Sequence, residues 1–262
     1  MKDVLSEIIS VKRKKVEQQK AKLPLRTIID EIKTEKFNTL SFKDALQNSE
    51  SGIIAEFKRK SPSKGWINEK ADVREITQSY QKNGAAALSV LTDTEFFGGS
   101  LRDLDFATGK ATVPVLRKEF IVDEYQIYQS KMFNANAILL IAAAITPQEC
   151  KQFTDLGHSL EMDVLLELHD ERELDYITPQ HNIIGINNRN LGSFVTDVQK
   201  SFKMIPFLPK EAILVSESGI SNPKTVKELR DAGYRGFLIG ENFMKTENPG
   251  ASLGEFILQI EK

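Results

Sequence analysis

The chain has 262 residues, and its 37 acidic and 35 basic side chains leave a formal net charge of −2. This balance argues against a protein built mainly to hold nucleic acid, for which a basic domain is expected, and no stretch reaches the roughly 18 apolar residues of a membrane helix. The single cysteine, Cys150, excludes an intramolecular disulfide, and three scattered histidines offer no credible zinc or haem site. The length fits either two small domains or one large α/β unit, because a (β/α)8 barrel needs about 250 residues.

The first fifty residues predict helices and no strand. Apolar residues recur at near-helical spacing across 4–16, and helical patterns follow near 25–32 and 42–47. The basic run at 12–15 is typical of a solvated helix face. We therefore expect residues 1–50 to form a helical extension that packs on the rest of the chain. This beginning has no long apolar core and no small-residue cleavage site, so we expect a cytoplasmic protein rather than a secreted one.

Eight short apolar runs follow, and each predicts a β-strand. They are apolar almost throughout rather than alternating, as in strands that are buried on both faces of a sheet. In chain order they span 52–58, 85–92, 113–118, 137–142, 163–168, 182–188, 212–218 and 236–241.

Helical patterns separate successive runs, at 73–82, 101–108, 124–133, 147–156, 223–232 and 253–260. Thr146 and Asn222 are the expected N-caps of two of them, each followed by a proline in the first turn. Strand–helix alternation repeated eight times implies parallel strands, and right-handed crossovers would close them. We therefore expect 51–262 to form one α/β catalytic domain, a (β/α)8 TIM barrel. The alternative, a doubly wound open sheet, usually has fewer strands and a GxGxxG turn, which is absent after the first run.

Polar side chains gather at the ends of these runs, where the active site of such a barrel lies. The set comprises Glu56, Lys58, Lys118, Glu167, Asn187, Asn188, Arg189, Glu217 and Ser218. Residues two apart on a strand share a face, so Glu56 and Lys58 should both point inward. Any one of these groups could be a solvated strand end. Three carboxylates and two lysines buried at one mouth would be costly unless they were paired or used.

Two glycines and one long loop predict a phosphate site. Gly219 follows the seventh run and Gly240 belongs to the end of the eighth, and a phosphate site of backbone N–H groups is frequent after these two strands. Glycine at such positions lets the backbone approach an anion closely. The first loop, 59–71, is long for a βα connection, and we interpret it as a lid or a phosphate-contacting flap.

Seven ordered segments resemble the indole-3-glycerol phosphate synthase family of tryptophan biosynthesis, and the similarity covers nearly the whole chain. The strongest is IIAEFKRKSPSKG at 53–65. The others are SVLTDTEFFGGS (89–100), VLRKEFIVDEYQIY (115–128), LLELHDERELD (165–175), GINNRNL (185–191), SESGI (216–220) and FLIGENFM (237–244). The helical extension also fits, because this family precedes its barrel with such a segment.

The resemblance implies catalytic roles at the barrel mouth. Lys118 resembles the family's general acid for ring closure, with Glu167 as its partner carboxylate. Lys58 resembles the second catalytic lysine, which is assigned to dehydration, and Glu56 resembles a carboxylate that acts with it or orients it.

The remaining residues resemble the groups that hold the substrate. Asn187, Glu217 and Ser218 resemble positioning groups close to the chemistry, and Arg189 resembles an orienting residue. The phosphate site would comprise Ser61, Gly219, Gly240 and the backbone at Glu241. The apolar pocket for the anthranilate ring would comprise Pro62, Phe97, Phe120 and Leu139.

The substrate that this resemblance implies is 1-(2-carboxyphenylamino)-1-deoxyribulose 5-phosphate. Lysine, with a pKa of about 10.4, is protonated at neutral pH and can donate to the carbonyl oxygen, whereas the pKa of arginine is too high. Two lysines and two glutamates match the protons needed for ring closure and dehydration. No step is a redox step, so no cofactor is implied. We expect a small phosphorylated partner, no nucleic acid, no membrane, and a monomer rather than an obligate oligomer.

Two alternatives fit the residues less well. Phosphoribosylanthranilate isomerase, another phosphate-binding barrel, would need a cysteine and an aspartate as its acid–base pair, and Cys150 falls in a predicted helix. A non-catalytic phosphosugar-binding barrel would keep the phosphate glycines and lose the inward charges. The presence of Glu56, Lys58, Lys118 and Glu167 argues against it.

Overall fold

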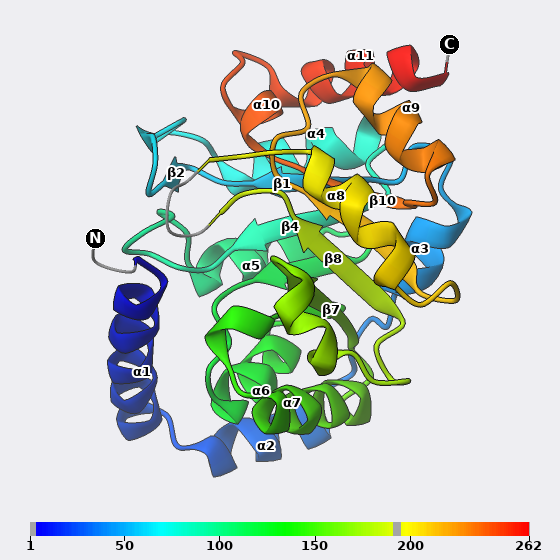
Figure 1. Ribbon diagram of the computed structural model, residues 1–262. Coiled ribbons are helices and arrows are strands. Elements are labelled where there is room, and N and C mark those ends of the chain that lie inside the picture. The colour runs from blue at the N-terminus through cyan, green and yellow to red at the C-terminus, as the bar shows by residue number, and fades with distance from the viewer. Residues whose placement is uncertain (1–3, 191–194, 262) are drawn as a thin grey trace.

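The computed structural model describes residues 4–190 and 195–261. Eight parallel strands form a closed barrel in the order β1-β10-β9-β8-β7-β6-β5-β4, with helices around it (Figure 1). The strands are β1 (Ile53–Phe57), β4 (Ala87–Leu91), β5 (Val115–Lys118), β6 (Ala137–Ile141), β7 (Asp163–Leu168), β8 (Ile183–Asn187), β9 (Ile213–Glu217) and β10 (Gly236–Ile239). All eight predicted strands, and the TIM-barrel fold that they imply, are confirmed.

The barrel strands consist of residues that are buried on both faces. Every residue of β1, β4, β6, β8, β9 and β10 is buried, because alternate side chains face the barrel interior and the surrounding helices. Ile54 of β1 pairs with Ala87 of β4 on one side and with Leu238 of β10 on the other. The sheet therefore closes on itself, and all eight carboxyl ends meet at one mouth.

The helices predicted between the strands are confirmed. They are α4 (Val73–Lys82), α5 (Leu101–Thr108), α6 (Glu124–Met132), α7 (Pro147–Ser159), α9 (Pro223–Asp231) and α11 (Pro249–Glu261), the last of which begins before its expected start at 253. The Thr146 hydroxyl accepts a hydrogen bond from the Glu149 N–H at 3.2 Å, and Asn222 Oδ1 accepts from the Lys224 N–H at 2.9 Å. Both expected N-caps are therefore formed, and Cys150 is buried in α7 as predicted.

Short elements fill the other connections. The 59–71 loop contains an antiparallel hairpin of β2 (Lys60–Ser61) and β3 (Gly65–Trp66), and η1 (Ala142–Ala144) follows β6. The remaining elements are η2 (Glu171–Tyr176), α8 (Gln199–Met204), η3 (Ile205–Phe207) and α10 (Glu241–Met244). The connections after β7 and β8 thus contain only short helical segments, η2 in the first and α8 with η3 in the second.

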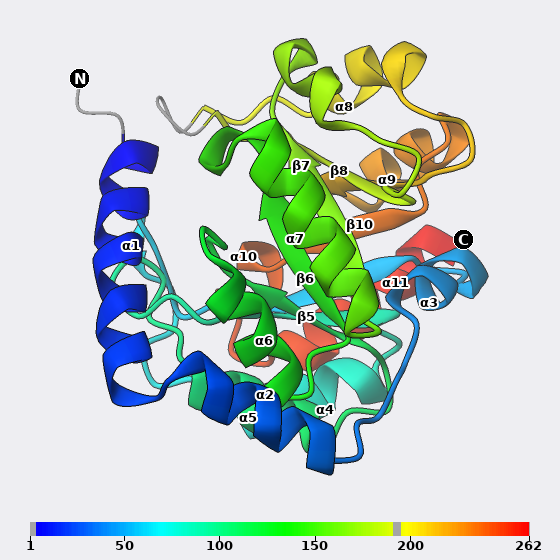
Figure 2. The same ribbon diagram turned by 90° about the horizontal axis from the view of Figure 1, so that it is seen from below.

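The chain before β1 forms α1 (Val4–Lys22), α2 (Leu25–Thr34) and α3 (Phe42–Asn48). Helix α1 runs along the side of the barrel, and α2 continues beneath it against α6 (Figure 2). Helix α3 contacts β4 and β9, and its buried Leu46 lies against Gly236 at the start of β10. This helix therefore covers the amino-terminal ends of the strands, opposite the mouth.

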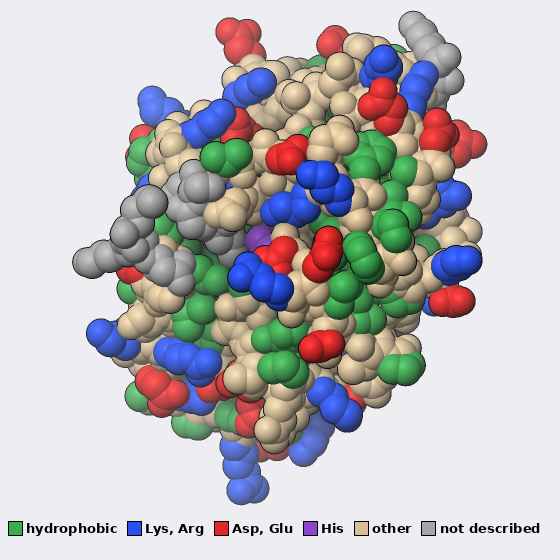
Figure 3. Space-filling model, in the orientation of Figure 1, with side chains coloured by type: hydrophobic (Ala, Val, Ile, Leu, Met, Phe, Trp, Pro, Cys, Tyr) green, Lys and Arg blue, Asp and Glu red, His purple; other side chains and the backbone are tan. Residues whose placement is uncertain are grey.

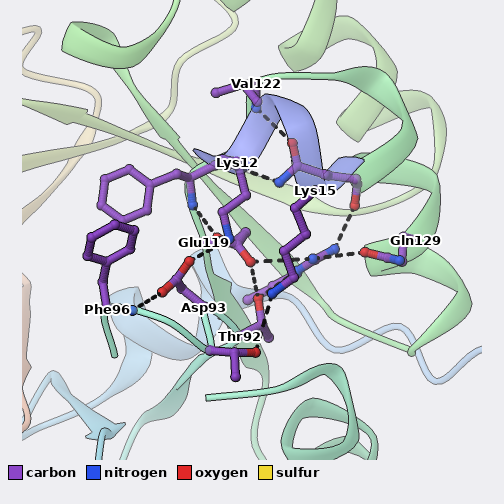
Figure 4. Close-up of polar contacts among 12 residues, drawn as sticks. Lys12, Lys15, Thr92, Asp93, Phe96, Glu119, Val122 and Gln129 are labelled. Carbon is purple, nitrogen blue, oxygen red and sulfur yellow. Dashed lines mark hydrogen bonds and ion pairs between the residues drawn. The ribbon is translucent and has the colours of Figure 1, made fainter. Parts of the chain in front are cut away.

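The prediction that the basic residues at 12–15 form a solvated helix face is wrong for Lys12, because this residue is only 2% exposed. Its Nζ lies 2.6 Å from Asp93 Oδ2 and 2.8 Å from Glu119 Oε1 (Figure 4). Lys12 shares the inner side of α1 with buried Ile8 and Val16, so the same helical spacing that buries those side chains also buries the lysine. Both carboxylates lie at the barrel mouth, and this ion pair therefore ties α1 to the loops there.

We predict that Lys12→Met lowers the free energy of unfolding by about 3 kcal/mol, because it leaves the buried Asp93 without its cation and Glu119 with only Arg117, at 3.7 Å. Lys14→Met is the matched control, since Lys14 is exposed on the same helix and such substitutions change stability by about 0.5 kcal/mol or less. Urea denaturation followed by circular dichroism measures both. Equal stability of the two variants would contradict a structural role for the Lys12 ion pair.

Candidate active site

A cavity of about 560 Å³ opens at the carboxyl-terminal mouth of the barrel. All eight barrel strands line it, through Glu56, Leu91, Lys118, Ile141, Glu167, Asn187, Glu217 and Ile239. The structure brings every predicted site residue to this lining except Ser61 and Asn188. Asn188 is buried against Ser201 and Ser216. Ser61 pairs with Gly65 in the hairpin, and the turn between them reaches the cavity instead. The Ser61 hydroxyl is buried and forms no hydrogen bond with the described residues, and its place in the phosphate site stays a prediction.

Lys118, the last residue of β5, lies between two buried carboxylates. Its Nζ is 2.9 Å from Glu167 Oε2 on β7 and 2.8 Å from Glu217 Oε2 on β9. The three residues come from alternate strands, whose inward side chains share a layer of the barrel. Burial works to lower the pKa of Lys118, but the charges of Glu167, Glu217 and Glu56 outweigh it and raise this pKa above its ordinary value. Lys118 is therefore a proton donor held in its charged form.

The two carboxyl groups beside Lys118 differ in their pKa values. Burial works to raise the pKa of Glu167, but the charges of Lys118 and His169 outweigh it, so this pKa is lowered. Burial raises the pKa of Glu217; Lys118 opposes this rise and the charge of Glu167 adds to it. Two carboxylates that share one cation cannot both ionise freely. The pair therefore favours an ionised Glu167 beside a Glu217 that retains a proton more readily.

Gly185 makes room for this arrangement. A Cβ at position 185 would overlap Glu217 Oε1, the oxygen that does not face Lys118. Glu217 Oε1 is buried and forms no hydrogen bond with the described residues. The absence of a side chain at Gly185 on β8 thus leaves room inside the barrel for the Glu217 carboxyl group of the neighbouring strand β9.

A second lysine–glutamate pair lies at the end of β1. Lys58 Nζ is 2.6 Å from Glu56 Oε1, and both residues line the cavity, as the two-residue spacing predicted. A Cβ at position 240 would overlap the Glu56 side chain. Gly240, predicted for close approach to a phosphate, therefore also provides the space that the Glu56 carboxylate occupies.

The loops after β8 and β9 present positioning groups. Asn187 Oδ1 accepts a hydrogen bond from the Arg189 N–H at 3.0 Å, and Asn187 acts to lower the pKa of Glu167. Ser218 and Gly219 adopt left-handed backbone angles, with φ of +68° and +77°. Asn188 Nδ2 donates to the Ser218 carbonyl at 3.1 Å, which fixes this unusual turn.

Cations converge at the side of the cavity where a phosphate was predicted. Glu241 at the start of α10 pairs with Lys64 of the hairpin at 2.5 Å and with Arg189 at 3.8 Å, and Lys245 also lines the cavity. The sequence interpretation used only the backbone of Glu241 and omitted Lys64 and Lys245 from the site. Lys64 belongs to the motif at 53–65, and this motif could have indicated that Lys64 is a site residue. No sequence pattern indicated Lys245.

An apolar wall lies near Lys118. The rings of Phe97 and Phe120 are 6.0 Å apart between centroids, and Leu139 and Pro62 line the same cavity. Helix α1 adds Val4, Leu5 and Ile8 to this lining, which the sequence interpretation missed. Their helical spacing marked an inward face, but spacing alone does not tell which part of the barrel that face covers.

The described residues contain no group of three or more His, Cys, Asp and Glu side chains that could hold a metal ion. The cavity thus offers ammonium, carboxyl, amide and hydroxyl groups beside an apolar wall. Such a site can transfer protons to and from an anionic substrate that carries an apolar ring.

Solved structures share the fold of this chain. A tryptophan synthase α-subunit from Pyrococcus furiosus superposes with a TM-score of 0.60 at 10% sequence identity, covering 81% of this chain and 98% of that one. A tryptophan synthase α-subunit from Legionella pneumophila superposes with a TM-score of 0.58 at 13% identity, covering 83% of this chain and 97% of that one. At these identities the likeness concerns the barrel architecture alone.

Curated sequences are much more similar. An indole-3-glycerol phosphate synthase from Bacteroides thetaiotaomicron is 53% identical, with both chains covered in full. One from Polaromonas naphthalenivorans is 41% identical over 97% of this chain and 98% of its own length. The family model for indole-3-glycerol phosphate synthase matches residues 5–256. This chain therefore belongs to the indole-3-glycerol phosphate synthase family.

Proposed function

We propose that this chain converts 1-(2-carboxyphenylamino)-1-deoxyribulose 5-phosphate into indole-3-glycerol phosphate, carbon dioxide and water. The observation that carries the proposal is the charged Lys118 between Glu167 and Glu217, in the same cavity as the Lys58–Glu56 pair. One cavity thus holds two separate proton donors, each with its own carboxylate, as two acid-assisted steps require.

Ring closure is assigned to Lys118. The ring carbon that bears the carboxylate attacks the carbonyl carbon of the sugar chain, and Lys118 donates a proton to the carbonyl oxygen as the bond forms. Carbon dioxide then leaves, and the electrons of the broken carbon–carbon bond restore the aromatic ring. Glu167, whose pKa is lowered, keeps Lys118 charged and oriented during this step.

Dehydration is assigned to Lys58. The hydroxyl formed in ring closure departs as water after it receives a proton, and a proton leaves the adjacent carbon to form the new double bond. Lys58 supplies the first proton, and Glu56 Oε1, 2.6 Å from its Nζ, keeps the ammonium group in place.

The two ends of the substrate have matching surroundings in the cavity. Lys64, Arg189 and Lys245 line the side where Gly219 and Gly240 lie, and they suit a phosphate group that carries about −1.5 to −2 charges. Phe97, Phe120, Leu139 and Pro62 suit the anthranilate ring. Binding energy at both ends can hold the ring carbon against the carbonyl carbon.

The wider expectations are part of this proposal. We propose that residues 1–50 are an extension that completes the barrel mouth, and that the protein is a cytoplasmic monomer. The exposed large apolar residues of the described chain are Trp66, Val195, Phe207 and Leu258, and no two of them belong to the same helix or strand. None of the helices in the described part of the chain is long and apolar enough to cross a membrane. Basic side chains are interspersed with acidic ones over the face shown in Figure 3, unlike a nucleic-acid-binding surface.

We predict that Lys118→Ala lowers kcat for formation of the indole product by about 10²- to 10⁴-fold, the contribution of a positioned general acid. Indole fluorescence measures the product, and circular dichroism checks the fold. Lys110→Ala, which removes an exposed lysine after α5, should retain full activity. Undiminished turnover by Lys118→Ala would refute the role of Lys118.

Lys58→Ala should stop the reaction after ring closure and decarboxylation, because it removes the acid assigned to loss of water. Rapid quenching followed by mass spectrometry should show a species that has lost carbon dioxide but retains the hydroxyl. If carbon dioxide release slows as much as indole formation and no such species accumulates, Lys58 acts earlier in the reaction.

The raised pKa of Glu217 predicts a pH dependence of stability. Between the ordinary carboxyl pKa of 4.5 and the raised value, the folded state binds more protons than the unfolded state, so wild-type stability falls as pH rises. Glu217→Gln carries no such proton, and its stability relative to wild type should increase with pH across this window. Urea denaturation at a series of pH values measures the difference; a difference that stays constant with pH would show that Glu217 ionises normally.

A further inference from the structure

His169 lies next to the proposed catalytic carboxylate without having a role in the steps above. It follows β7 directly, two residues beyond Glu167, and it is buried. Its Nε2 is 3.3 Å from Glu167 Oε1, the oxygen that does not face Lys118. Its Nδ1 is 3.8 Å from Glu173 Oε2 on η2. The ring therefore stands between a carboxylate at the bottom of the cavity and one nearer the surface.

The backbone fixes this position. The His169 N–H donates a hydrogen bond to Glu173 Oε2 at 2.5 Å, so η2 is anchored to the end of β7 by the same carboxylate that faces the ring. Neither ring nitrogen has a hydrogen-bond partner in the described part of the chain, so the contacts with Glu167 and Glu173 are close charge contacts rather than hydrogen bonds. A neutral imidazole would leave one nitrogen as an acceptor facing a carboxylate, which has no proton to give. An imidazolium instead places a positive charge between the two carboxylates.

The charged surroundings favour the imidazolium. The described charged groups that act on or face His169 are Glu167 on β7, Asp170 and Glu173 beside η2, and Lys200 on α8. Burial and Lys200 work to lower the pKa of His169, but Glu173 and Glu167 outweigh them and raise this pKa above 6.5. Lys200 is itself engaged, since its Nζ donates to the Asn187 carbonyl at 2.9 Å.

We propose that His169 is a positioning residue for the reaction: as an imidazolium between Glu167 and Glu173, it orients the Glu167 carboxylate toward Lys118 and keeps it ionised. This inference rests on the proposed function for its kinetic consequence, but the charge of the ring is a property of the free protein. The two parts can therefore be tested separately.

The charge of His169 is measured by long-range ¹H–¹⁵N spectra of the histidine rings in the unliganded protein. At about pH 6.5, the ordinary imidazole pKa, most His169 rings should carry protons on both nitrogens, because this pKa is raised. His181 is an internal reference for a neutral ring, because burial lowers its pKa to about 4 and its Nδ1 accepts a hydrogen bond from the Thr178 N–H at 3.0 Å. The His169→Gln variant assigns the signal. A neutral His169 at this pH overturns the proposal.

The effect on Glu167 is measured by the pH profile of kcat. Loss of an adjacent cation raises a carboxyl pKa by about one unit or more, so in His169→Gln the acid limb of the profile should move up by about one pH unit with KM little changed. Glu173→Gln should not raise this limb, because the ring stays charged at these pH values; it should instead lower the pKa of His169 in the spectra, because Glu173 raises that pKa. A uniform fall in kcat at all pH values, with the acid limb in place, would mean that His169 only supports the fold and would overturn the proposal.

Glu171→Gln is the matched control, because Glu171 is an exposed glutamate on the same short helix, η2; its profile should match that of the wild type. If His169→Gln does not fold, the ring spectra of wild type and Glu173→Gln still decide the question, because the signal of His169 should be the one whose pKa falls in Glu173→Gln. Wild-type protein that makes no indole product from the proposed substrate would refute the proposed function, whereas the spectra would still report the charge of His169.

Discussion

Lys118 stands inside the barrel mouth between two carboxylates that are both withdrawn from water. Removing one member of such a buried cluster is costly, because it leaves an uncompensated charge in a poorly polarisable environment. The cluster therefore constrains the strands that carry it. β5, β7 and β9 must end in register so that Lys118, Glu167 and Glu217 meet in one layer, and the parallel barrel supplies that register.

Several neighbouring features serve this cluster and its companion pair. Gly185 and Gly240 lack the side chains that would overlap Glu217 and Glu56, so a glycine in β8 and a glycine directly after β10 make space for carboxylates on the neighbouring strands β9 and β1. His169 faces the remaining oxygen of Glu167. Neighbouring groups thus hold the charged side chains of the site in fixed positions. Less rearrangement of these side chains is therefore needed when a proton is transferred.

The extension before the barrel contributes to the same mouth. Its apolar residues Val4, Leu5 and Ile8 line the cavity, and Lys12 neutralises Asp93 and Glu119 (Figure 4). Glu119 directly follows Lys118, and its Oε1 also accepts a hydrogen bond from the Phe120 N–H at 2.9 Å. A helix outside the barrel is therefore connected, through one carboxylate, to the segment that carries both Lys118, the proposed general acid, and Phe120 of the apolar wall.

The sequence by itself determined the eight strands, most helices and their N-caps, because continuous apolar runs, helical spacing and capping residues are local signals. It also indicated which polar residues gather at the mouth, since parallel strands place their carboxyl ends together. Only the tertiary structure decided that Lys12 is buried, that Ser61 lies outside the cavity lining and that His169 faces Glu167. Those outcomes depend on contacts between segments far apart in the chain, whose mutual distances and burial have no counterpart in local residue patterns.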